Sequence, residues 1–344
     1  MFNRILIVGL GSIGERHKDL VCKLFPQAEI KVLRLTAQNH PSESRIKFLS
    51  TLQGAKLFSP EIAVICSPST SHTSLARELV RVGAHLLIEK PLSHSREGIL
   101  ELLQECASNN SILMVGYNLR YLKSLQEFRK CINEGLIGNV LSVRCEVGQY
   151  LPNWRPKIDY RESVSARSEL GGGVLLELSH EIDYLRWIFG EVDWVRATTL
   201  RQSKLEIDVE DTAHLTIGFE KKSKNQQLIA HLNMDFIRHD STRSCVAIGD
   251  KGSLRWDGIS GEVSFFQSGE KNWRTLFFSD VGIEETYALE WEEFTRAIKA
   301  KTSPAVTGED GLRVVEIVEA ARLSAKNGIQ TYVIRSLIKN KVSK

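Results

Sequence analysis

Short apolar runs alternate with amphipathic stretches over the first third of the chain. The predicted strands are ILIVG, EIKVLRL, EIAVICSP (61–68), AHLLIEKP (84–91) and ILMVGY (112–117). Apolar residues at helical spacing predict helices after residue 12, near 71–82 and near 94–109. Nearly continuous apolar strands that alternate with helices indicate a parallel sheet covered on both faces.

The pattern changes near residue 120. Polar and apolar residues alternate more strongly in the next predicted strands, which include VLSVRCEVGQY, VDWVRATTL, TAHLTIGFE and QQLIAHLNMDF. This alternation is typical of an antiparallel sheet with one less buried face. Helices are predicted near 284–300 and 309–326. We therefore expect an α/β chain of two domains, residues 1–119 and 120–344.

The first predicted strand runs into a glycine turn, Gly9-x-Gly11-x-x-Gly14, which precedes a helix. In this context Gly9 permits a tight turn, Gly11 lets a pyrophosphate approach the backbone, and Gly14 lets helix and strand pack closely. The free N–H groups at the helix start, around Ser12 and Ile13, would receive the phosphate charge. The motif predicts a dinucleotide-binding Rossmann domain with a doubly wound parallel sheet.

The end of the second predicted strand distinguishes NADP from NAD. NAD-binding domains usually place an acidic residue there, about 20 residues on, for the ribose 2′-hydroxyl. Here Arg34 stands 20 residues beyond Gly14, and Glu29 comes too early. A guanidinium pairs with a 2′-phosphate. We therefore expect NADP, with NAD as the alternative and a merely solvated Arg34 as the other interpretation.

Charge and composition exclude several other classes. The chain has 344 residues and a net charge of +3, which gives no reason to expect nucleic acid or a membrane as partner. No stretch approaches the ~20 apolar residues that span a bilayer. The six cysteines are scattered without a C-x-x-C pair, as in a cytoplasmic protein with reduced thiols.

Two clusters could carry chemistry. Glu89-Lys90-Pro91 ends a strand at the edge where open α/β sheets bind ligands, and a partly desolvated lysine there can exchange a proton with a substrate oxygen. By itself, this lysine could equally be a surface residue at the start of a loop.

The second cluster is Gly171-Gly172-Gly173 followed by VLLELSHEIDYLRWIFG. If this segment is one helix, Glu177, His180 and Tyr184 share a polar face, with Asp183 on the flank. A histidine beside a carboxylate after a glycine-rich loop suggests a site. The alternative is an exposed amphipathic helix in which His180 has no chemical role.

Together these segments resemble the glucose–fructose oxidoreductase / inositol dehydrogenase / MocA (Gfo/Idh/MocA) family. The similar segments are SPSTSHTSLARELVRVGAHLLIEKP, GYNLRY (116–121), GGGVLLELSHEID, GDKGSLRWDG (249–258) and DGLRVVEIVEAARLSAKNG. Their order and spacing cover essentially the whole chain. The resemblance implies a C-terminal α+β domain with a large, mostly antiparallel open sheet, and a homodimer or homotetramer formed through that sheet.

The resemblance also implies roles for individual residues. Lys90 would exchange the proton and hold the substrate oxygen, and His180 would face the nicotinamide and substrate, with Asp183 completing its motif. Many members carry an aspartate four residues before this histidine; here Leu176 has that position and the acid is Glu177. The remaining implied positions near the cofactor are Ser67, Pro68, Ser69, His72, Glu89 and Asn118, with Tyr117 and Arg120 flanking Asn118 on the substrate side.

The segment 149–170 is a candidate substrate loop. It contains Trp154, Arg155, Tyr160, Arg161 and Arg167 just before the triple glycine. Aromatic faces stack on sugar rings, and arginines bind carboxylates or phosphates. This composition suggests an anionic or nucleotide-linked sugar, possible in surface-polysaccharide metabolism. Ordinary packing would explain the same residues.

We therefore expect an NAD(P)-dependent oxidoreductase that acts on a hydroxyl or keto carbon of a sugar. One alternative is a non-catalytic NAD(P)-binding sensor, although cofactor binding alone requires neither Lys90 nor His180. The other is a dehydrogenase of the same fold acting on a cyclitol or dihydrodiol. We expect no metal.

Overall fold

The computed structural model describes residues 2–35, 46–156, 158–221, 226–280 and 282–337, and the chain divides into two units. The first unit contains the chain up to Tyr117, Tyr287–Val315 and the end of the chain from Arg335. The second contains Asn118–Thr286 and Glu316–Ile334. A segment far along the chain, 287–315, thus belongs with the N-terminal residues and not with the 120–286 segment.

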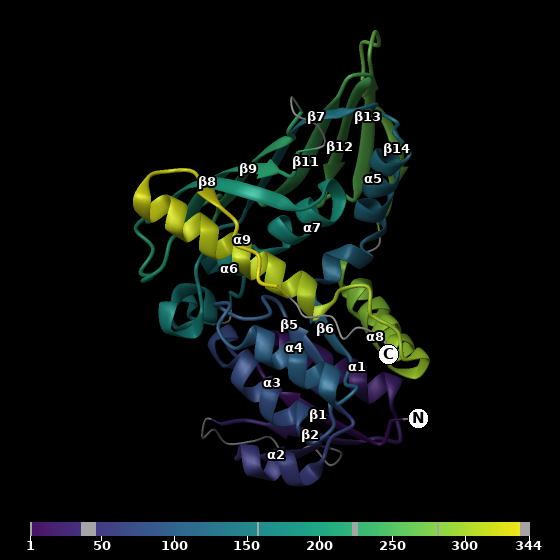
Figure 1. The fold of residues 1–344 in the computed structure, drawn as a ribbon, viewed down its shortest axis with the longest axis vertical. Coiled ribbons are helices and arrows are strands. Elements are labelled where there is room, and N and C mark those ends of the chain that lie inside the picture. Colours follow the sequence, from purple (N-terminus) through teal and green to yellow (C-terminus); the bar gives the residue numbers. More distant parts are fainter. Residues whose placement is uncertain (1, 36–45, 157, 222–225, 281, 338–344) are drawn as a thin grey trace. The chain divides into compact units, whose positions relative to one another are not determined.

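Six parallel strands form the sheet of the first unit (Figure 1). Across the sheet their order is β3 (Ile46–Leu49), β2 (Glu29–Leu33), β1 (Arg4–Val8), β4 (Ile62–Ile65), β5 (His85–Glu89) and β6 (Leu113–Gly116). The order reverses between β1 and β4, and ligands of doubly wound folds bind beyond the strand ends at such a point. The predicted parallel Rossmann sheet is confirmed.

Helices cover this sheet and bury its central strands. They are α1 (Ser12–Leu24), α2 (Leu52–Phe58), α3 (His72–Val80), α4 (Ile99–Ser108), α8 (Ile283–Ala300) from Tyr287 onward and the first part of α9 (Gly308–Asn327). Ile5, Val64 and Leu87 from three of the strands are all 0% exposed. Burial on both faces explains why these strands are nearly continuous apolar runs in the sequence.

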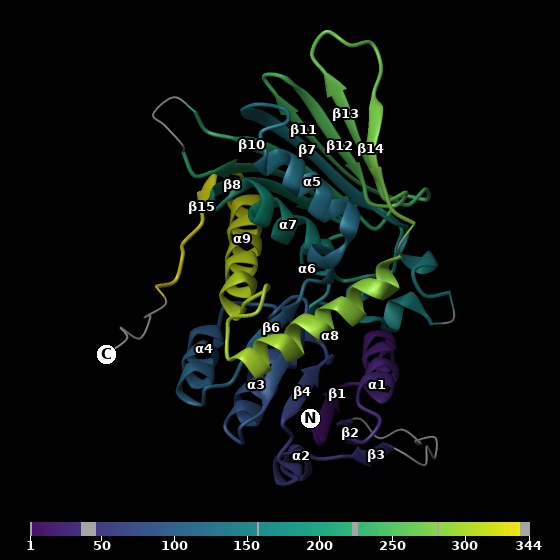
Figure 2. The ribbon, with the colours of Figure 1, turned by 90° about the vertical axis from the view of Figure 1, so that its right-hand side faces the viewer.

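Nine strands form the sheet of the second unit (Figure 2). Their order is β14 (Arg274–Phe278), β13 (Glu262–Gln267), β12 (Gly252–Asp257), β11 (Thr242–Gly249), β7 (Val140–Gly148), β10 (Ile229–Asp235), β9 (Thr212–Phe219), β8 (Val192–Leu200) and β15 (Thr331–Tyr332). Every pairing is antiparallel except that of β10 with β7. The expected large, mostly antiparallel sheet is confirmed.

The α-helices of the second unit are α5 (Lys123–Asn133), α6 (Val174–Glu177), α7 (His180–Phe189), the start of α8 up to Thr286 and the second part of α9. Hydrogen bonds attach them to the sheet: Trp256 Nε1 donates to Ser124 Oγ, and the Ala197 amide donates to Ser324 Oγ. Short 3-10 turns complete the connections at Ser69–Ser71, Asn118–Tyr121, Leu151–Asn153, Tyr160–Glu162, Val164–Ala166 and Ser168–Leu170.

The prediction of one continuous helix after the triple glycine is wrong. The segment breaks at Leu178 and Ser179, between α6 and α7. Tyr184 is 0% exposed, and its hydroxyl lies 2.8 Å from Cys145 Sγ, so it does not share a polar face with Glu177 and His180. The break changes the rotation of α7, and periodicity taken across it therefore misplaces Tyr184.

All six cysteines are free thiols; five are buried and Cys22 on α1 is partly exposed. Burial raises the pKa of the Cys66 thiol, and so do the nearby carboxyl groups of Glu89 and Glu290. The Cys66 thiol is therefore protonated and unreactive at neutral pH. None of the helices in the described ranges is long and apolar enough to cross a membrane.

Candidate functional site

The loop between β1 and α1 has the geometry of a phosphate cradle. Gly9 has a φ of +89°, and a Cβ there would lie 2.8 Å from the Ser67 amide nitrogen. A Cβ on Gly14 would lie 2.2 Å from the Gly9 carbonyl oxygen. A Cβ on Gly11 would meet no atom within 4 Å. Gly9 and Gly14 are thus required by the protein's own packing, whereas Gly11 faces open space that a ligand can enter.

The start of α1 completes this cradle. Gly11 is the N-cap residue and has no side chain to cap the helix, and the first intrahelical bond runs from the Glu15 amide to the Gly11 carbonyl at 2.9 Å. The amides of Ser12, Ile13 and Gly14 therefore precede the first hydrogen bond of the helix. Together with the positive end of the helix dipole they form a place for a pyrophosphate.

Arg34 directly follows β2, at the edge where an adenosine ribose lies in Rossmann domains. Its amide donates to the Leu49 carbonyl at 2.9 Å, which fixes the backbone at this position. The sequence from Arg34 to Ser42 contains no acidic residue. The described end of β2 therefore offers a guanidinium and no carboxylate.

The loop after β4 is connected to the loop after β5 by one buried histidine. His72 is 1% exposed; its Nε2 lies 2.7 Å from the Ser67 carbonyl oxygen and its Nδ1 lies 3.0 Å from the Pro91 carbonyl oxygen. Burial lowers the pKa of His72. Ser67 Oγ is also 2.7 Å from Ser71 Oγ. The predicted cofactor residues of 67–72 therefore form one hydrogen-bonded loop with the Lys90–Pro91 segment.

Lys90 lies at the carboxyl end of β5 and is half-buried, while Glu89 is buried at 6% exposure. The Glu89 carboxylate accepts a hydrogen bond from His17 Nε2 at 2.8 Å and one from the Lys90 amide at 3.2 Å. Trp291 Nε1 in turn donates to His17 Nδ1 at 2.9 Å. The sequence analysis identified Lys90 but not His17 or Trp291, which are 274 residues apart.

In the second unit, Arg120 and Asp183 form a buried ion pair. Arg120 Nη2 donates to Asp183 Oδ1 at 2.6 Å, and Nε donates to Oδ2 at 2.8 Å. The two side chains are 5% and 1% exposed. Arg120 also lies over the Trp187 ring, with its guanidinium carbon 5.6 Å from the ring centroid. Asp183 is therefore held as an ionised hydrogen-bond acceptor.

His180 begins α7 and is half-buried. Glu177 is the last residue of α6, and its Oε2 accepts a hydrogen bond from Ser165 Oγ at 2.7 Å. This contact directs the Glu177 carboxylate toward the loop before the triple glycine. Asn118, another predicted site residue, donates from Nδ2 to Thr286 Oγ1 at 2.8 Å and is buried.

The predicted substrate loop packs largely against its own unit. Trp154 Nε1 donates to the Gln149 carbonyl at 3.1 Å, and the Trp154 ring meets Phe236 edge-on at 5.2 Å. The Tyr160 hydroxyl accepts from the Glu206 amide at 3.2 Å. Trp154, Arg155 and Tyr160 border a space of only about 10 Å³. Arg155 is exposed.

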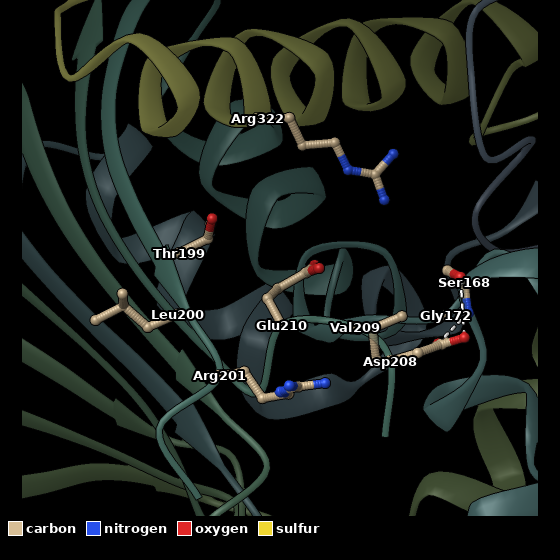
Figure 3. Close-up of a pocket in the computed structure, with 9 residues that line it drawn as sticks. All are labelled: Ser168, Gly172, Thr199, Leu200, Arg201, Asp208, Val209, Glu210 and Arg322. Atoms are coloured by element: carbon tan, nitrogen blue, oxygen red, sulfur yellow. Dashed lines mark hydrogen bonds between the residues drawn. The ribbon is translucent and has the colours of Figure 1, made fainter. Parts of the chain in front are cut away.

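A larger hollow of about 500 Å³ lies beside the triple glycine in the same unit (Figure 3). Figure 3 shows Arg322 reaching into it from α9, with Glu210 below and Asp208 beside Ser168. Burial raises the pKa of Glu210, whose Oε1 accepts from the Leu175 amide at 3.1 Å. The remaining lining residues are Gly172, Thr199, Leu200, Arg201 and Val209.

This hollow offers both hydrogen-bond donors and acceptors, which suits a polyhydroxylated ligand. The sequence analysis missed Glu210 and Arg322 because they come from segments more than 100 residues apart. No local spacing connects a loop residue before β9 with a residue on the last helix.

Family models match nearly the whole chain. Residues 3–117 match the oxidoreductase family model for the NAD-binding Rossmann fold (GFO_IDH_MocA), and residues 129–333 match the model for the C-terminal alpha/beta domain of the same family.

Full-length relatives are also found. Myo-inositol 2-dehydrogenase of Thermotoga maritima is 26% identical over 93% of this chain and 96% of its own length. The crystal structure of the WlbA dehydrogenase from Bordetella pertussis with NADH and UDP-GlcNAcA has a TM-score of 0.80 at 21% identity, covering 98% of this chain and 100% of that one. Levoglucosan dehydrogenase in complex with NADH and L-sorbose has a TM-score of 0.82 at 20% identity, covering 96% and 99%. At such identities the two solved structures establish the shared fold.

Proposed function

Because the chain belongs to the Gfo/Idh/MocA oxidoreductase family, we propose that it uses NADP(H) to oxidise or reduce a hydroxyl or keto carbon of a sugar or nucleotide-linked sugar. The observation that carries the proposal is the glycine cradle, in which Gly11 faces open space at the start of α1. The dinucleotide, when bound, supplies or accepts the hydride.

Arg34 supports the preference for NADP. It stands where the ribose 2′ position of a bound dinucleotide would lie, and a guanidinium there attracts a 2′-phosphate. NAD-binding members of this fold usually place a carboxylate at this position. In this chain, Arg34 leaves a bare 2′-hydroxyl without such an acceptor.

Lys90 is the proposed proton-transfer residue. The loop that carries it is fixed by Glu89 on one side and by the contact of His72 with Pro91 on the other. Only the end of the Lys90 side chain then needs to move with the substrate oxygen. We assign His180 the role of orienting the same oxygen, and Asp183 the role of holding Arg120 in place at the start of the second unit.

The proposed substrate is a polyhydroxylated ring. The hollow beside Gly172 combines Ser168, Thr199 and Glu210 with two arginines, and it contains no extended apolar wall. The named relatives include enzymes for inositol and for levoglucosan-type sugars. Arg155, which is exposed on the neighbouring loop, would favour an anionic or nucleotide-linked form of the sugar.

We also propose a cytoplasmic homo-oligomer that pairs through the face of the second sheet opposite its helices. Arg144, Glu146, His231 and Asn233 alternate with buried residues along β7 and β10 on this face. They border a shallow hollow of about 380 Å³. These side chains offer hydrogen-bond donors and acceptors to a second copy of the chain.

Two measurements test the function. First, the protein is titrated with NADPH and with NADH while nucleotide fluorescence is followed, and tighter binding of NADPH is expected. Second, oxidation or reduction of the bound nucleotide is followed with a panel of inositols, anhydrosugars and UDP-linked uronic acids. The Lys90→Met variant should bind NADPH normally and lose turnover, whereas Lys47→Met, at an exposed position of β3, should keep both. Near-normal turnover by Lys90→Met would exclude the proposed proton transfer.

A further inference from the structure

Three titratable side chains meet inside the first unit, behind the proposed proton-transfer lysine. His17 comes from α1, Glu89 from the end of β5 and Glu290 from α8. They are 0%, 6% and 0% exposed, and one nitrogen or oxygen from each lies within 4.8 Å of those from the other two. Charged groups are rarely buried together unless they are paired or protonated.

Hydrogen bonds determine which nitrogen of His17 carries the proton. The indole N–H of Trp291 can only donate, so His17 Nδ1, 2.9 Å away, is the acceptor. The ring proton is therefore on Nε2 and is donated to Glu89 Oε1 at 2.8 Å. An imidazolium would place a second proton on Nδ1, directly against the indole N–H. His17 in this arrangement is a neutral donor.

This arrangement excludes His17 as a metal ligand. A metal-bound histidine normally donates its other ring N–H to an acceptor. Here the other ring nitrogen accepts a hydrogen bond, so a metal on Nε2 would require an imidazolate. The three groups have the spacing of a metal site but not its hydrogen bonding.

Glu290 differs from its two neighbours. Both its carboxyl oxygens are buried and have no hydrogen-bond partner among the described residues. Burial and the nearby Glu89 carboxyl raise the pKa of Glu290 well above its usual value. An ionised carboxylate in this position would face Glu89 without compensation, and a protonated carboxyl group is the stable form.

The groups around Glu290 do not change this conclusion. The buried His72, whose pKa is lowered by burial, interacts with Glu89. Tyr287 on α8 and Cys66 after β4 interact with both carboxyl groups, and the pKa of each is raised, mainly by burial. Both are therefore neutral near pH 7. The Arg16 guanidinium on α1 lies over the Tyr287 ring, with its central carbon 4.7 Å from the ring centroid.

We propose that His17, Glu89 and Glu290 form one buried proton-holding cluster that positions Lys90 against the dinucleotide. Glu290 keeps the proton of the two neighbouring carboxyl groups. Glu89 uses its two oxygens for two different donors, His17 and the Lys90 amide. Because His17 is on the helix whose start forms the phosphate cradle, the proton-holding cluster connects that cradle to the backbone of Lys90. The role assigned to Lys90 rests on the proposed function.

The end of β6 leaves space for the Glu89 carboxylate of this cluster. Gly116 pairs with Glu89 across the two strands. A Cβ on Gly116 would lie 3.1 Å from both Cδ and Oε2 of Glu89. The absence of a side chain at this position leaves room for the carboxylate to turn toward both donors.

The protonation of Glu290 can be tested without any substrate. Infrared spectroscopy separates the C=O stretch of a protonated carboxylic acid from the bands of a carboxylate. Subtracting the spectrum of Glu290→Gln from that of the wild type at pH 7 should reveal one carboxylic acid. Glu61→Gln is the control, because the Glu61 carboxylate accepts hydrogen bonds from the amides of Asn3 and Arg4 and its replacement should remove a carboxylate band instead. A carboxylate band lost in Glu290→Gln, or a stoichiometric metal in the purified protein, would overturn the proposal.

The positioning of Lys90 is tested by its reactivity. The rate of Lys90 acylation by an amine-selective reagent is measured by mass spectrometry from pH 6 to 10, in the presence and in the absence of NADPH. In Glu89→Gln one amide hydrogen must face a donor, since Gln has one acceptor oxygen where Glu has two. Its Lys90 acylation rate, or the effect of NADPH on that rate, should change at least several-fold, whereas Glu61→Gln should match the wild type.

Activity then distinguishes this proposal from the proposed function. If the wild type turns over a substrate of the panel, Glu89→Gln should lower kcat by about ten-fold or more, because one hydrogen bond that positions Lys90 is lost. The NADPH affinity should be nearly unchanged. Glu290→Gln should shift the alkaline limb of the kcat profile, and a merely structural role would not. Equal kcat profiles for Glu89→Gln and Glu61→Gln would overturn the positioning role. If the wild type turns over no substrate, but the carboxylic acid band of Glu290 and the change in Lys90 acylation are both observed, only the proposed function is rejected.

Discussion

Arg120 and Asp183 share two parallel hydrogen bonds, of 2.6 and 2.8 Å, with both side chains buried. The pair connects the 3-10 turn Asn118–Tyr121 to the middle of α7. Two parallel bonds hold the planar guanidinium and the carboxylate in a fixed mutual orientation. Asp183, which follows His180 by three residues, thus has a structural partner within its own unit. Any account of its role in the reaction must include this pairing.

Asp183→Asn should strongly destabilise the protein. The substitution removes the carboxylate charge that pairs with the buried Arg120 guanidinium, and breaking such a pair typically costs about 3–5 kcal/mol. The measurement is the urea midpoint of unfolding of the second unit, followed by tryptophan fluorescence. Asp159→Asn is the control, because Asp159 pairs with Arg161 at the surface, where both side chains are exposed. Equal midpoints for the two variants would show that the Arg120–Asp183 pair contributes little.

Two single-methyl substitutions separate folding from binding in the glycine cradle. In Gly14→Ala the new Cβ would lie 2.2 Å from the Gly9 carbonyl oxygen, and the protein should lose stability. In Gly11→Ala the Cβ points into open space at a φ of −76°, so stability should stay within about 0.5 kcal/mol of the wild type.

Dinucleotide affinity should respond to the Gly11 methyl. If the pyrophosphate lies against Gly11, its displacement should weaken NADPH binding by about ten-fold or more, the equivalent of ~1.4 kcal/mol. Thermal melts and nucleotide fluorescence titrations of both variants give the comparison. Normal NADPH affinity in Gly11→Ala would place the dinucleotide elsewhere.

Arg34→Ser should reverse the preference between the two nucleotides. Loss of the charge-assisted hydrogen bonds to the 2′-phosphate should weaken NADPH binding by about ten- to a hundred-fold, which corresponds to ~1.5–3 kcal/mol. NADH affinity should change little. Arg4→Ser, at the opposite end of β1, controls for general loss of positive charge. A constant ratio of the two Kd values in Arg34→Ser would favour the interpretation of Arg34 as a solvated residue.

Glu290 should make the stability of the protein fall as the pH rises. Its pKa is raised in the folded protein, so the unfolded chain releases this proton first, near its ordinary value of 4.5. The stabilisation by proton retention is complete below that pH and is lost between it and the folded pKa, at up to ~1.4 kcal/mol per pH unit. Glu290→Gln removes this dependence, and the variant should gain stability over the wild type progressively from pH 5 to 8.

The difference between the two urea unfolding curves isolates Glu290 from other groups. Glu210 also has a pKa raised by burial and contributes equally to both proteins. Glu61→Gln again provides the control. Parallel stability curves for the wild type and Glu290→Gln would mean that Glu290 is ionised in the folded protein.

The sequence was sufficient for the elements that are buried on both faces. Strands such as ILIV and IAVI are apolar at every position because helices cover both sides of the parallel sheet. The edge strands β3 and β14 were missed for the opposite reason: all five residues of β14 are partly or fully exposed, and their pattern resembles that of a loop. Helix α5 was missed as well, because Leu125, Phe128 and Cys131 are its few large buried apolar residues.

The residues of the candidate site also differ in how far the sequence predicts them. The roles of the three glycines follow from local stereochemistry, and the sequence contains that information. Pairs such as Arg120 with Asp183, or His17 with Trp291, depend on how distant segments meet, and no spacing along the chain predicts them. The error at Tyr184 arose because a two-residue break between α6 and α7 cannot be inferred from a uniform apolar stripe.

The distribution of the six thiols gives the molecule a built-in attachment point for a reporter. Cys22 is the one cysteine that is not buried, and it belongs to the helix whose first turn forms the phosphate cradle. A maleimide dye should therefore label the native sequence mainly at this residue. Its emission would report occupancy of the cradle during catalysis in real time, with no cysteine removed and none introduced.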